Sequence, residues 1–480
     1  MSIHQSAIAH LFSLFSNDAI EHIQQLPQSG GDRVYFRIFT STQQTYIATV
    51  NNFVKENEAF FYCTAHFKHI GAPVPTIFIK NDEGTIYIQE DFGDQSLLAI
   101  LEQEGPTDAV QLLYKKSLKA LAHLQIKGAV GFDYDNCITS KVFGKQAILS
   151  DLLYFKYYFL DTLKLPYDKE QLGAAFEVLS NYLHEADYQF FMYRDFQSRN
   201  IMIKNGEPYF IDYQGGMMGA LQYDVASLLW QAKAHLNDDW KHDLFKYYRD
   251  CVAELLPTPI DAHRFESQYN GFVLIRLLQV LGAYGFRGLF ERKAHFLTSI
   301  PMALENLRSF MQHYRIGIDV PELEKVLNAI TTDDVIHRFK PIRATKETPL
   351  VVHIKSFSFL KSGYPKNVSD NGGGFVFDCR GILNPGRIEQ HKKETGRDKP
   401  VQIYLQEKTR MEEFLAGVYS VVDIAVEDYI QRNFEVLEVN FGCTGGQHRS
   451  VYAADALARH LKNKYGVATT IKHIEQNFDN

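Results

Sequence analysis

Hydrophobic and polar positions at the start of the chain follow the patterns of a sheet with helices beside it. Apolar and polar side chains alternate over RVYFRIF and TYIATV in residues 33–50, which predicts two strands joined by the polar STQQ. VPTIFIK and TIYIQED, about the turn NDEG, predict a β-hairpin. Residues 10–25 and 56–69 have the apolar spacing of helices. The first ninety residues therefore predict a small, mostly β region.

Further along, apolar positions recur at helical spacing. Residues 107–128 begin at a threonine that can cap a helix and end at a glycine, and residues 146–187 are also mostly helical. Two short strand signals interrupt this pattern: FFMYRDF, and then IMIK and EPYFIDY about an Asn-Gly turn, which predicts a tight hairpin. The helical pattern resumes over about 224–327. A larger helical region is thus expected after the sheet.

The last third of the chain has a different organisation. Residues 331–348 are polar and break the periodicity, so they are interpreted as a linker between a domain at 1–330 and a domain at 349–480. Strand and helix signals then alternate, which predicts a small α/β domain. The expected strands are 349–355, 374–380 and 434–441, and the expected helices are 408–432 and 450–464.

Composition narrows the class of protein. A chain of 480 residues with 45% hydrophobic and 22% charged residues is long enough for two or three globular domains. A formal net charge of -7 gives no overall attraction to nucleic acid or to an anionic membrane. The five cysteines are scattered without a CxxC pair, which disfavours a disulfide framework and a zinc site. With no signal-peptide pattern and no long uncharged apolar run, we expect a cytoplasmic protein without a membrane span.

Candidate catalytic residues lie in YRDFQSRN at 193–200 and in IDY at 211–213. Phosphoryl transfer requires a carboxylate near the attacking hydroxyl and oxygen ligands for magnesium on the phosphates. Asp195 would supply that carboxylate, while Asn200 and Asp212 would hold the metal with hard oxygen ligands. A lone aspartate is usually structural, but this trio on a loop and at the end of a hairpin indicates a kinase site.

The stretch YRDFQSRNIM, followed by YFIDYQGGMMGALQYDVASLL, resembles the aminoglycoside-phosphotransferase and choline-kinase branch of the protein-kinase fold. More narrowly, it resembles bacterial sugar kinases that phosphorylate N-acetylmuramate and N-acetylglucosamine. The resemblance covers roughly residues 10–315. It implies an α+β, bilobal protein-kinase-like fold, with an N-lobe at about 1–92 and a C-lobe at about 96–330. It also implies ATP and Mg²⁺ as cofactors, and Arg199 as a residue that steadies phosphate or loop.

The nucleotide side of this resemblance has a gap. Gly30 and Gly31 would lie over the phosphates, where backbone N–H groups are the donors. Glu58 on the next helix would be the partner of a strand lysine, yet TYIATV contains no lysine, so Lys55 or Arg37 is expected to substitute. The remaining nucleotide-binding candidates stand where the resemblance places the adenine hinge and are Gln89, Glu90 and Asp91.

Three further positions depart from the family or have two interpretations. Tyr193 replaces a histidine before Arg-Asp, and we expect it to substitute by packing and hydrogen bonding. Gly215-Gly216 replaces Asp-Ala, which we expect to alter substrate contacts. Asp224 is interpreted first as the N-cap of a helix, with substrate or loop anchoring as the alternative.

A second motif, FEVLEVNFGCTGGQHRS, ends the predicted strand at 434–441. The loop N–H groups and the start of the following helix would form an anion site, and Arg449 adds a bidentate donor for phosphate. Cys443 and Arg449 have a C-x5-R-S spacing that resembles protein tyrosine phosphatases, in which the thiolate is a nucleophile. Gly442 stands where those enzymes usually have histidine, so a phosphatase is the less favoured alternative.

The stretch CTGGQHRSVYAADALA resembles more closely the C-terminal domain of the RapZ family of bacterial amino-sugar regulators, over about 349–475. This resemblance implies a RapZ C-terminal-like α/β domain that binds a phosphosugar such as glucosamine-6-phosphate. Some RapZ proteins also bind RNA through a basic C-terminus, whereas this chain ends IKHIEQNFDN, which gives RNA binding no support. The candidate phosphosugar ligands are Cys443, Thr444, Gly445, Gly446, His448, Arg449 and Ser450.

Both resemblances indicate amino-sugar metabolism of the kind used in cell-wall recycling. The sequence therefore predicts an ATP- and Mg²⁺-dependent sugar kinase, a transferase with an alcohol acceptor, whose C-terminal domain senses a phosphosugar. The alternative is a regulatory adaptor that binds RNA or a protein and has a non-catalytic kinase-like half. The missing strand lysine favours the adaptor, and the trio of Asp195, Asn200 and Asp212 argues against it.

Overall fold

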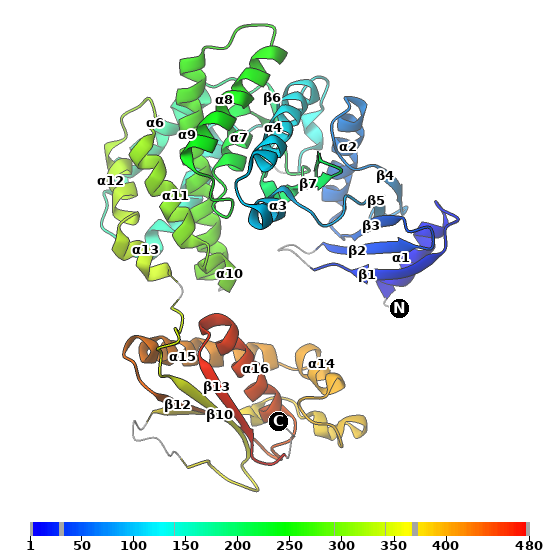
Figure 1. Cartoon of the computed structure of the whole chain (residues 1–480), viewed down its shortest axis with the longest axis vertical. Helices are drawn as coiled ribbons and strands as arrows, with labels where there is room; N and C mark the ends of the chain where they lie inside the picture. Colours follow the sequence, from blue (N-terminus) through cyan, green and yellow to red (C-terminus); the bar gives the residue numbers. More distant parts are fainter. Residues whose placement is uncertain are drawn as a thin grey trace. The chain divides into compact units, whose positions relative to one another are not determined.

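The chain divides into two compact units, Met1–Phe339 and Lys340–Asn480 (Figure 1). The computed structural model describes residues 3–27, 33–138, 140–291, 293–340, 342–366 and 373–476. Each unit has its own hydrophobic core and is described by itself.

The first unit opens with a five-stranded antiparallel sheet in the order β1-β2-β3-β5-β4. Helix α1 (Ile3–Ser13) covers one face of the sheet and buries Ile8, Leu11 and Phe12 against it. The other face carries Tyr35, Arg37 and Gln89, which line a cavity described below. The strands are β1 (Ile20–Gln25), β2 (Val34–Thr40), β3 (Thr45–Val50), β4 (Ile77–Lys80) and β5 (Ile86–Glu90).

The single helix expected over residues 10–25 is wrong. Helix α1 ends at Ser13, and Ile20–Gln25 forms strand β1. Between them the backbone N–H of Asp18 donates to the Ser16 hydroxyl at 3.1 Å, while the Asp18 carboxylate accepts from Thr42 at 3.0 Å. Short polar side chains that bond the local backbone compete with a helix. The strand that follows is at the edge of the sheet and shows little apolar alternation to reveal it.

Helices form most of the rest of the first unit (Figure 1). Helix α9 packs against α5, α7 and α11, and the predicted cap of α4 is confirmed, since the Thr107 hydroxyl accepts from Val110 N at 3.3 Å. The helices are α2 (Val54–His69), α3 (Leu97–Glu104), α4 (Asp108–Gly128), α5 (Lys145–Tyr158), α6 (Lys169–His184), α7 (Leu221–Leu229), α8 (Asp238–Leu255), α9 (Ala262–Tyr284), α10 (Ala294–Leu297), α11 (Ile300–His313), α12 (Pro321–Ile330) and α13 (Asp333–Phe339).

Two small antiparallel pairs carry the segment with the candidate catalytic residues. Strand β6 (Phe190–Met192) pairs with β9 (Met217–Gly219), and β7 (Ile201–Lys204) pairs with β8 (Glu207–Phe210). The β7–β8 hairpin turns through Asn205 at φ 55° and Gly206 at φ 75°, the left-handed pair that a type I′ turn requires. The hairpin predicted from the Asn-Gly turn is therefore confirmed.

The segment expected as a linker contains a helix. Helix α13 (Asp333–Phe339) lies within 331–348 and buries Val335 and Ile336, so the first unit extends to Phe339. The polar pattern hid this helix because only two of its seven residues are buried. Elsewhere, Ala262–Phe290 is long and apolar enough to cross a membrane by length and composition alone, but 61% of its most apolar window is buried inside the unit. A core helix of a globular unit shows the same burial.

The second unit is a parallel sheet in the order β11-β12-β10-β13. Strand β12 pairs with a neighbour on either side and is buried along nearly its whole length. The predicted alternation of strands and helices is confirmed, and the structure adds α14 and β13, which the pattern did not indicate. The elements are β10 (Val351–Ser358), β11 (Gly374–Asp378), α14 (Lys399–Glu407), α15 (Met411–Gln431), β12 (Val436–Cys443), α16 (Arg449–Tyr465) and β13 (Ala468–His473).

Candidate active site

A cavity of about 840 Å³ lies against the inner face of the N-terminal sheet. Its walls come from β2, β3, β5 and α2 on one side and from residues 199–214 on the other. The polar side chains that line it are Arg33, Tyr35, Arg37, Asn51, Glu56, Tyr87, Gln89, Glu90, Asp91, Asp94, Ser96, Arg199, Asn200, Asp212 and Gln214. The size and mixed lining of this cavity suit a ligand with both apolar and charged parts.

Asp195 lies beside this cavity, on the loop between β6 and the short helix Ser198–Asn200. Its Oδ1 accepts a hydrogen bond from Arg276 Nη2 at 3.1 Å; the Arg276 side chain is 4% exposed and that of Asp195 is 50% exposed. Burial raises the pKa of Asp195, but the positive charges of Arg276, Arg194 and Arg199 outweigh it, so the pKa lies below its usual 3.8. The carboxylate is therefore charged at neutral pH.

The backbone of this loop is held in an unusual conformation by a buried carboxylate. Arg194 has φ 79°, in the left-handed region that non-glycine residues seldom adopt. Asp224 accepts hydrogen bonds from Tyr193 N at 2.7 Å, from Arg194 N at 2.9 Å and from Gln125 Nε2 at 2.8 Å. Burial raises the pKa of Asp224 to about 7, opposed by these donors. The Asp224 carboxylate thus holds the loop in the strained conformation at Arg194, which the loop would otherwise relax.

Asp224 was expected first as a helix N-cap, and this is wrong. The residue lies inside α7, whose N-cap is Ala220, and its side chain is fully buried. The loop-anchoring alternative matches the contacts of Asp224. Arg194 takes part in the same anchoring, because its guanidinium donates to both oxygens of Asp151 at 2.9 Å and lies over the ring of Phe143. No sequence signal pointed to Asp151.

Asn200, Asp212 and Gln214 bring oxygen atoms to the cavity. Asn200 Nδ2 donates to the carbonyl of Asp195 at 3.0 Å, which turns the amide oxygen away from the loop. Gln214 Nε2 donates to Asp212 Oδ1 at 2.8 Å, and its own Oε1 is buried without a hydrogen-bond partner in the described part of the chain. Asp212 has φ 71°, a second left-handed residue beside the cavity. This donor set of hard oxygens fits Mg²⁺.

Arg33, which no sequence pattern singled out, places a cation beside Asp212. Its guanidinium is paired with Glu56: Nε donates to Glu56 Oε2 at 3.1 Å and Nη2 contacts Oε1. Arg33 Nη1 lies 3.6 Å from Asp212 Oδ1. Glu58, the expected partner of a strand cation, is exposed on α2 and is not one of the described residues that line the cavity. The carboxylate of α2 that faces the cavity is that of Glu56.

Among the other candidates for nucleotide binding, Arg37 contacts a different part of the cavity wall from Arg33. It pairs with Asp91 at 2.7 Å and with Asp94 at 2.8 Å, next to the end of β5. Gln89 and Glu90 also line the cavity, whereas Lys55 donates to the Ile138 carbonyl at 3.3 Å. The expected positions Gly30 and Gly31 lie outside the described residues.

Two departures from the family pattern have a packing explanation. Tyr193 is fully buried, and its hydroxyl donates to the Ile211 carbonyl while its ring packs edge-on to Phe196 and Phe210. At Gly216 an added Cβ would come within 2.1 Å of the Phe191 ring. Gly216 is therefore required by packing against β6, and the expected change in substrate contacts on replacing Asp-Ala stays a prediction.

In the second unit, the loop after β12 surrounds the Cys443 thiol with donors. Gly446 N donates to Sγ at 3.2 Å, and Ser450 Oγ lies 3.2 Å from Sγ. Burial raises the pKa of Cys443, but the Ser450 and Gly446 donors and the charge of Arg449 outweigh it, so the pKa lies below its usual 9.0. Gly446 has φ 67°, which only glycine adopts readily. Gly446 N and the first turn of α16 thus lie around the thiol, in the segment where the sequence predicts an anion site.

Arg449 and His448 are largely occupied in bracing this loop. Arg449 is 4% exposed; its Nη1 donates to the Ile382 carbonyl at 2.8 Å, while its Nε is buried without a partner among the described residues. His448 Nε2 lies 2.9 Å from the His391 carbonyl, and burial lowers the pKa of His448. Thr444 and Gly445 are more accessible than the other candidates, since Cys443, Gly446 and Ser450 are buried.

Two observations disfavour a phosphatase at Cys443. Cys443 is 2% exposed, which leaves its Sγ little room for a direct attack on the phosphorus of a bound phosphate ester. At Gly442, where a phosphatase would have histidine, an added Cβ would lie 2.4 Å from the Phe359 ring and 2.5 Å from that of Phe357. No side chain beyond glycine fits there without a rearrangement of these rings.

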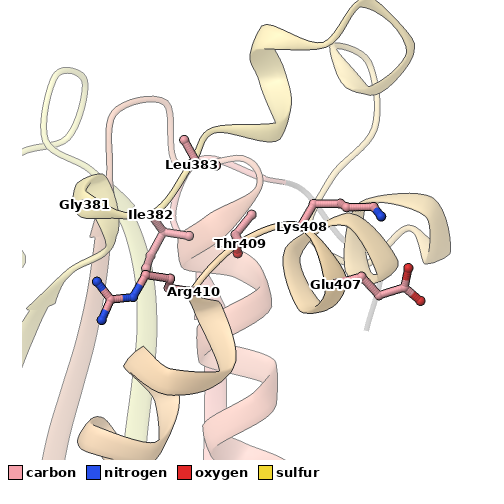
Figure 2. Close-up of a pocket in the computed structure, with 7 residues that line it drawn as sticks. All are labelled: Gly381, Ile382, Leu383, Glu407, Lys408, Thr409 and Arg410. Carbon is pink, nitrogen blue, oxygen red and sulfur yellow. The ribbon is translucent and has the colours of Figure 1, made fainter. Parts of the chain in front are cut away.

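A second cavity, of about 550 Å³, lies in this unit next to the Arg449 contacts. Residues 381–383 line one side and residues 407–410 the other (Figure 2). Ile382, whose carbonyl accepts from Arg449, belongs to this lining. The predicted phosphosugar residues are not among the described residues that line this cavity, so it is separate from the Cys443 loop.

Family models match both units. Residues 22–257 match the phosphotransferase enzyme family, and residues 350–477 match the RapZ C-terminal domain. The predicted bilobal kinase-like α+β fold and the small α/β domain after it are both confirmed by these matches.

Curated relatives bear the name nucleotide-binding protein. One from Bifidobacterium adolescentis is 35% identical over 156 residues, which cover 32% of this chain and 46% of the relative. One from Fusobacterium nucleatum is 27% identical over 273 residues, which cover 52% of this chain and 89% of the relative. One from Thermotoga neapolitana is 37% identical over 122 residues, 25% of this chain and 41% of the relative. The chain thus spans less than half the length of the Bifidobacterium and Thermotoga proteins.

Similar solved structures are kinases of small molecules. Choline kinase LicA from Streptococcus pneumoniae is 14% identical with a TM-score of 0.44, over 64% of this chain and 100% of that one. An ethanolamine kinase from Plasmodium vivax is 13% identical with a TM-score of 0.44, over 60% of this chain and 82% of that one.

Proposed function

Because this chain joins a kinase-like domain of the phosphotransferase enzyme family to a RapZ C-terminal domain, we propose that it is an ATP- and Mg²⁺-dependent kinase that phosphorylates a hydroxyl of an amino sugar. The observation that carries this proposal is the charged Asp195 carboxylate, held by Arg276 on a strained loop beside a cavity with Asn200 and Asp212 in its wall. These residues meet the needs of phosphoryl transfer, which are positioning and electrostatic stabilisation.

In this mechanism the acceptor hydroxyl donates a hydrogen bond to the Asp195 carboxylate. The arginines around Asp195 lower its pKa, which makes it a weak base. It therefore orients the hydroxyl first and accepts its proton late, as the bond to phosphorus forms, which suits a loose transition state. Arg276 fixes Oδ1, so the carboxylate does not rotate away from the acceptor. The transferred phosphoryl group ends on the sugar oxygen, and ADP leaves.

Asn200 and Asp212 would hold Mg²⁺, which supplies charge neutralisation on the phosphate oxygens when bound. Gln214 keeps Asp212 in place through its 2.8 Å hydrogen bond. The nucleotide base would lie toward Gln89, Glu90 and Asp91 at the end of β5, and its phosphates toward Asn200 and Asp212. Arg199, which also lines the cavity, would contact phosphate.

The amino-sugar acceptor rests on sequence resemblance and on the nature of the second unit. The loop of residues 443–449 would bind the phosphate of a phosphosugar through backbone N–H groups at the start of α16. The buried, unpartnered Nε of Arg449 adds positive potential behind that loop. A kinase whose second domain binds a phosphosugar would sense its own product or a related metabolite, and we expect a cytoplasmic location for both.

The test is ATP consumption by the whole chain against N-acetylmuramate, N-acetylglucosamine, glucosamine, choline and an aminoglycoside, with and without glucosamine-6-phosphate. Turnover of an amino sugar should fall roughly 10²- to 10⁴-fold in Asp195→Asn, the range of a lost general base. Asp250→Asn, an exposed surface carboxylate paired with Arg249, is the matched control and should keep full turnover. An Asp195→Asn variant as active as its parent would remove Asp195 from the mechanism.

No turnover of any acceptor, combined with stabilisation of the protein by glucosamine-6-phosphate, would favour the regulatory adaptor instead. Thermal unfolding with and without the phosphosugar separates the two, because a ligand that binds only the folded state raises the unfolding temperature.

A further inference from the structure

We infer that Arg33 is the cation that positions the nucleotide phosphates in this active site, in place of the lysine that strand β3 lacks. The inference rests on the proposed kinase function and deepens it by naming the residue that reads the phosphates. A guanidinium that enters from the start of β2 replaces an ammonium group from the middle of β3, so the partner carboxylate on α2 changes as well.

The first support is where Arg33 lies. It is the residue before β2 (Val34–Thr40), yet its side chain is only 13% exposed and lines the cavity with Glu56 and Asp212. Two of its nitrogen atoms, Nε and Nη2, contact the two oxygens of Glu56. This fork geometry fixes the plane of the guanidinium. A solvated surface arginine has neither the burial nor the fixed plane.

The second support is the direction of the remaining nitrogen. Arg33 Nη1 lies 3.4 Å from the Tyr35 hydroxyl and 3.6 Å from Asp212 Oδ1, longer than its sister contacts with Glu56. Nη1 therefore faces the Asp212 carboxylate, and its contacts with Asp212 and Tyr35 are both longer than the contact of Nε with Glu56. A phosphate oxygen beside Asp212 would accept from it, and Glu56 would hold the guanidinium in place meanwhile.

The third support is that Glu56 is itself braced. Asn51 Nδ2 donates to Glu56 Oε2 at 2.9 Å and to Asn57 Oδ1 at 3.0 Å. Asn57 is 1% exposed, and its Nδ2 donates to the Asn51 and Gly84 carbonyls at 2.8 Å. A chain of buried amides thus fixes the carboxylate that fixes Arg33. Such bracing is expected where the position of a charge matters.

The position on β3 that faces the cavity beside these residues is Thr49, which is uncharged. On β3, Thr49 pairs across the sheet with Tyr35 on β2 and with Tyr87 on β5. Both tyrosines line the cavity, and paired residues share a face of the sheet, so Thr49 points to the same side. Thr49 is fully buried and short. A lysine at position 49 would point toward the cavity, which makes this position a site for a transplant.

The experiment compares the affinity of ADP with that of adenosine, both measured by calorimetry on the whole chain with Mg²⁺. In Arg33→Ala we expect ADP affinity to fall on the order of 10²-fold, the cost of a lost donor to a charged group, with adenosine affinity unchanged. Arg33→Lys keeps the charge and loses the fork, so it should lie between. Arg249→Ala, which breaks an exposed pair with Asp250, is the control and should change neither affinity.

The double variant Arg33→Ala/Thr49→Lys moves the cation to β3. It should regain at least about tenfold of the lost ADP affinity, as expected for a restored charge-assisted contact. Melting temperatures of all variants show which are folded. A folded double variant that remains as weak as Arg33→Ala would overturn the idea that a cation beside Glu56 is what the phosphates need.

The outcomes separate this inference from the proposed function. Equal losses of ADP and adenosine affinity in Arg33→Ala, or no loss of either, would overturn the role of Arg33 even if the chain phosphorylates a sugar. A selective loss of ADP affinity would support it even if no acceptor is turned over, in which case only the proposed reaction fails.

Discussion

The loop around Asp195 in the first unit and the loop around Cys443 in the second differ in how far their functional candidates are exposed. In the first unit, the Asp195 side chain is 50% exposed, and its neighbours Asn200 and Asp212 line a cavity of about 840 Å³. In the second unit, Cys443 is 2% and Arg449 is 4% exposed, and both are bonded to their own loop or to nearby carbonyls. The first loop thus has side chains at or beside a cavity, whereas Cys443 and Arg449 of the second are buried.

This difference in exposure suggests a different function for each loop. A side chain that reaches a ligand can exchange a proton with it, and a fixed backbone donor can only bind. The first loop also contains a left-handed Arg194 that a buried carboxylate holds in place, a strain typical of catalytic segments. In the second loop the left-handed residue is Gly446, where this conformation costs little. We therefore expect chemistry at the first loop and recognition at the second.

The largest effect should come from removing the anchor of the first loop. Asp224→Ala leaves the N–H groups of Tyr193 and Arg194 without their acceptor, at a cost of about 3 kcal/mol in the free energy of unfolding. Turnover should fall at least as far as in Asp195→Asn, because the loop loses its strained form. Chemical denaturation and ATP consumption measure the two effects. Full activity in the alanine variant would show that the loop holds its shape unaided.

The next effect concerns the charge of Asp195. Arg276→Gln removes the cation that donates a hydrogen bond to Asp195, so the pKa of Asp195 should rise. In the folded parent protein the pKa of Asp195 lies below 3.8, so the carboxylate is still ionised at pH 3.8. It becomes protonated only when the pH falls through the lower, folded pKa. The acid limb of kcat/KM should therefore move to higher pH, with a drop of about tenfold in kcat from the lost hydrogen bond. An acid limb at an unchanged pH would assign the limb to another group.

A smaller effect should follow from crowding the second loop. Gly442→Ala would press a Cβ within 2.4 Å of the Phe359 ring, which should cost about 1–3 kcal/mol in the stability of that unit. Gly445→Ala is the matched control, since a Cβ there meets nothing within 4 Å. Both keep every backbone N–H. Thermal unfolding should separate them, and equal stabilities would mean that the two phenylalanine rings move aside at little cost.

The smallest effect should be a change in the pKa of the Cys443 thiol. Ser450→Ala removes the hydroxyl 3.2 Å from Cys443 Sγ, so the pKa of the thiol should rise toward its ordinary 9.0. The thiolate absorbance in the ultraviolet, followed against pH, measures this shift, and the Cys443→Ser variant identifies the part of the signal that belongs to this thiol. The phosphosugar affinity should change only a few-fold, as expected for one indirect neutral hydrogen bond. A large loss of affinity would mean that Ser450 contacts the ligand itself.

Part of the candidate site in the first unit could be predicted from the sequence, because several of its residues lie in one short segment. Asp195, Asn200 and Asp212 could be proposed together because they lie in one short segment, with a hairpin that the Asn-Gly turn predicts. The structure brings Asn200 and Asp212 to one cavity, and the roles of all three stay predictions. Arg33 and Glu56 could not be found in this way, because their pairing depends on how β2 and α2 pack. Asp151 and Asp224 act on the loop from distant helices, and nothing in the local sequence distinguishes them from surface carboxylates.

Local sequence also failed where a helix or strand is only partly buried. Strand β1 and helix α13 have few apolar positions, so their patterns resembled a continued helix and a linker. In the second unit the anion site that the loop motif indicates stays a prediction. The motif could not show that Arg449 and His448 contact the carbonyls of Arg380 and His391, because those two residues lie outside it.

The ion pair of Arg37 with Asp91 and Asp94 has a consequence for inhibitor chemistry. These side chains line the cavity at the end of β5, where a flat, apolar heterocycle would meet a charged wall. Compounds without polar groups would leave that wall unused. A scaffold with an amidine for the two carboxylates, or with an acid for the arginine, would use the polarity of this wall.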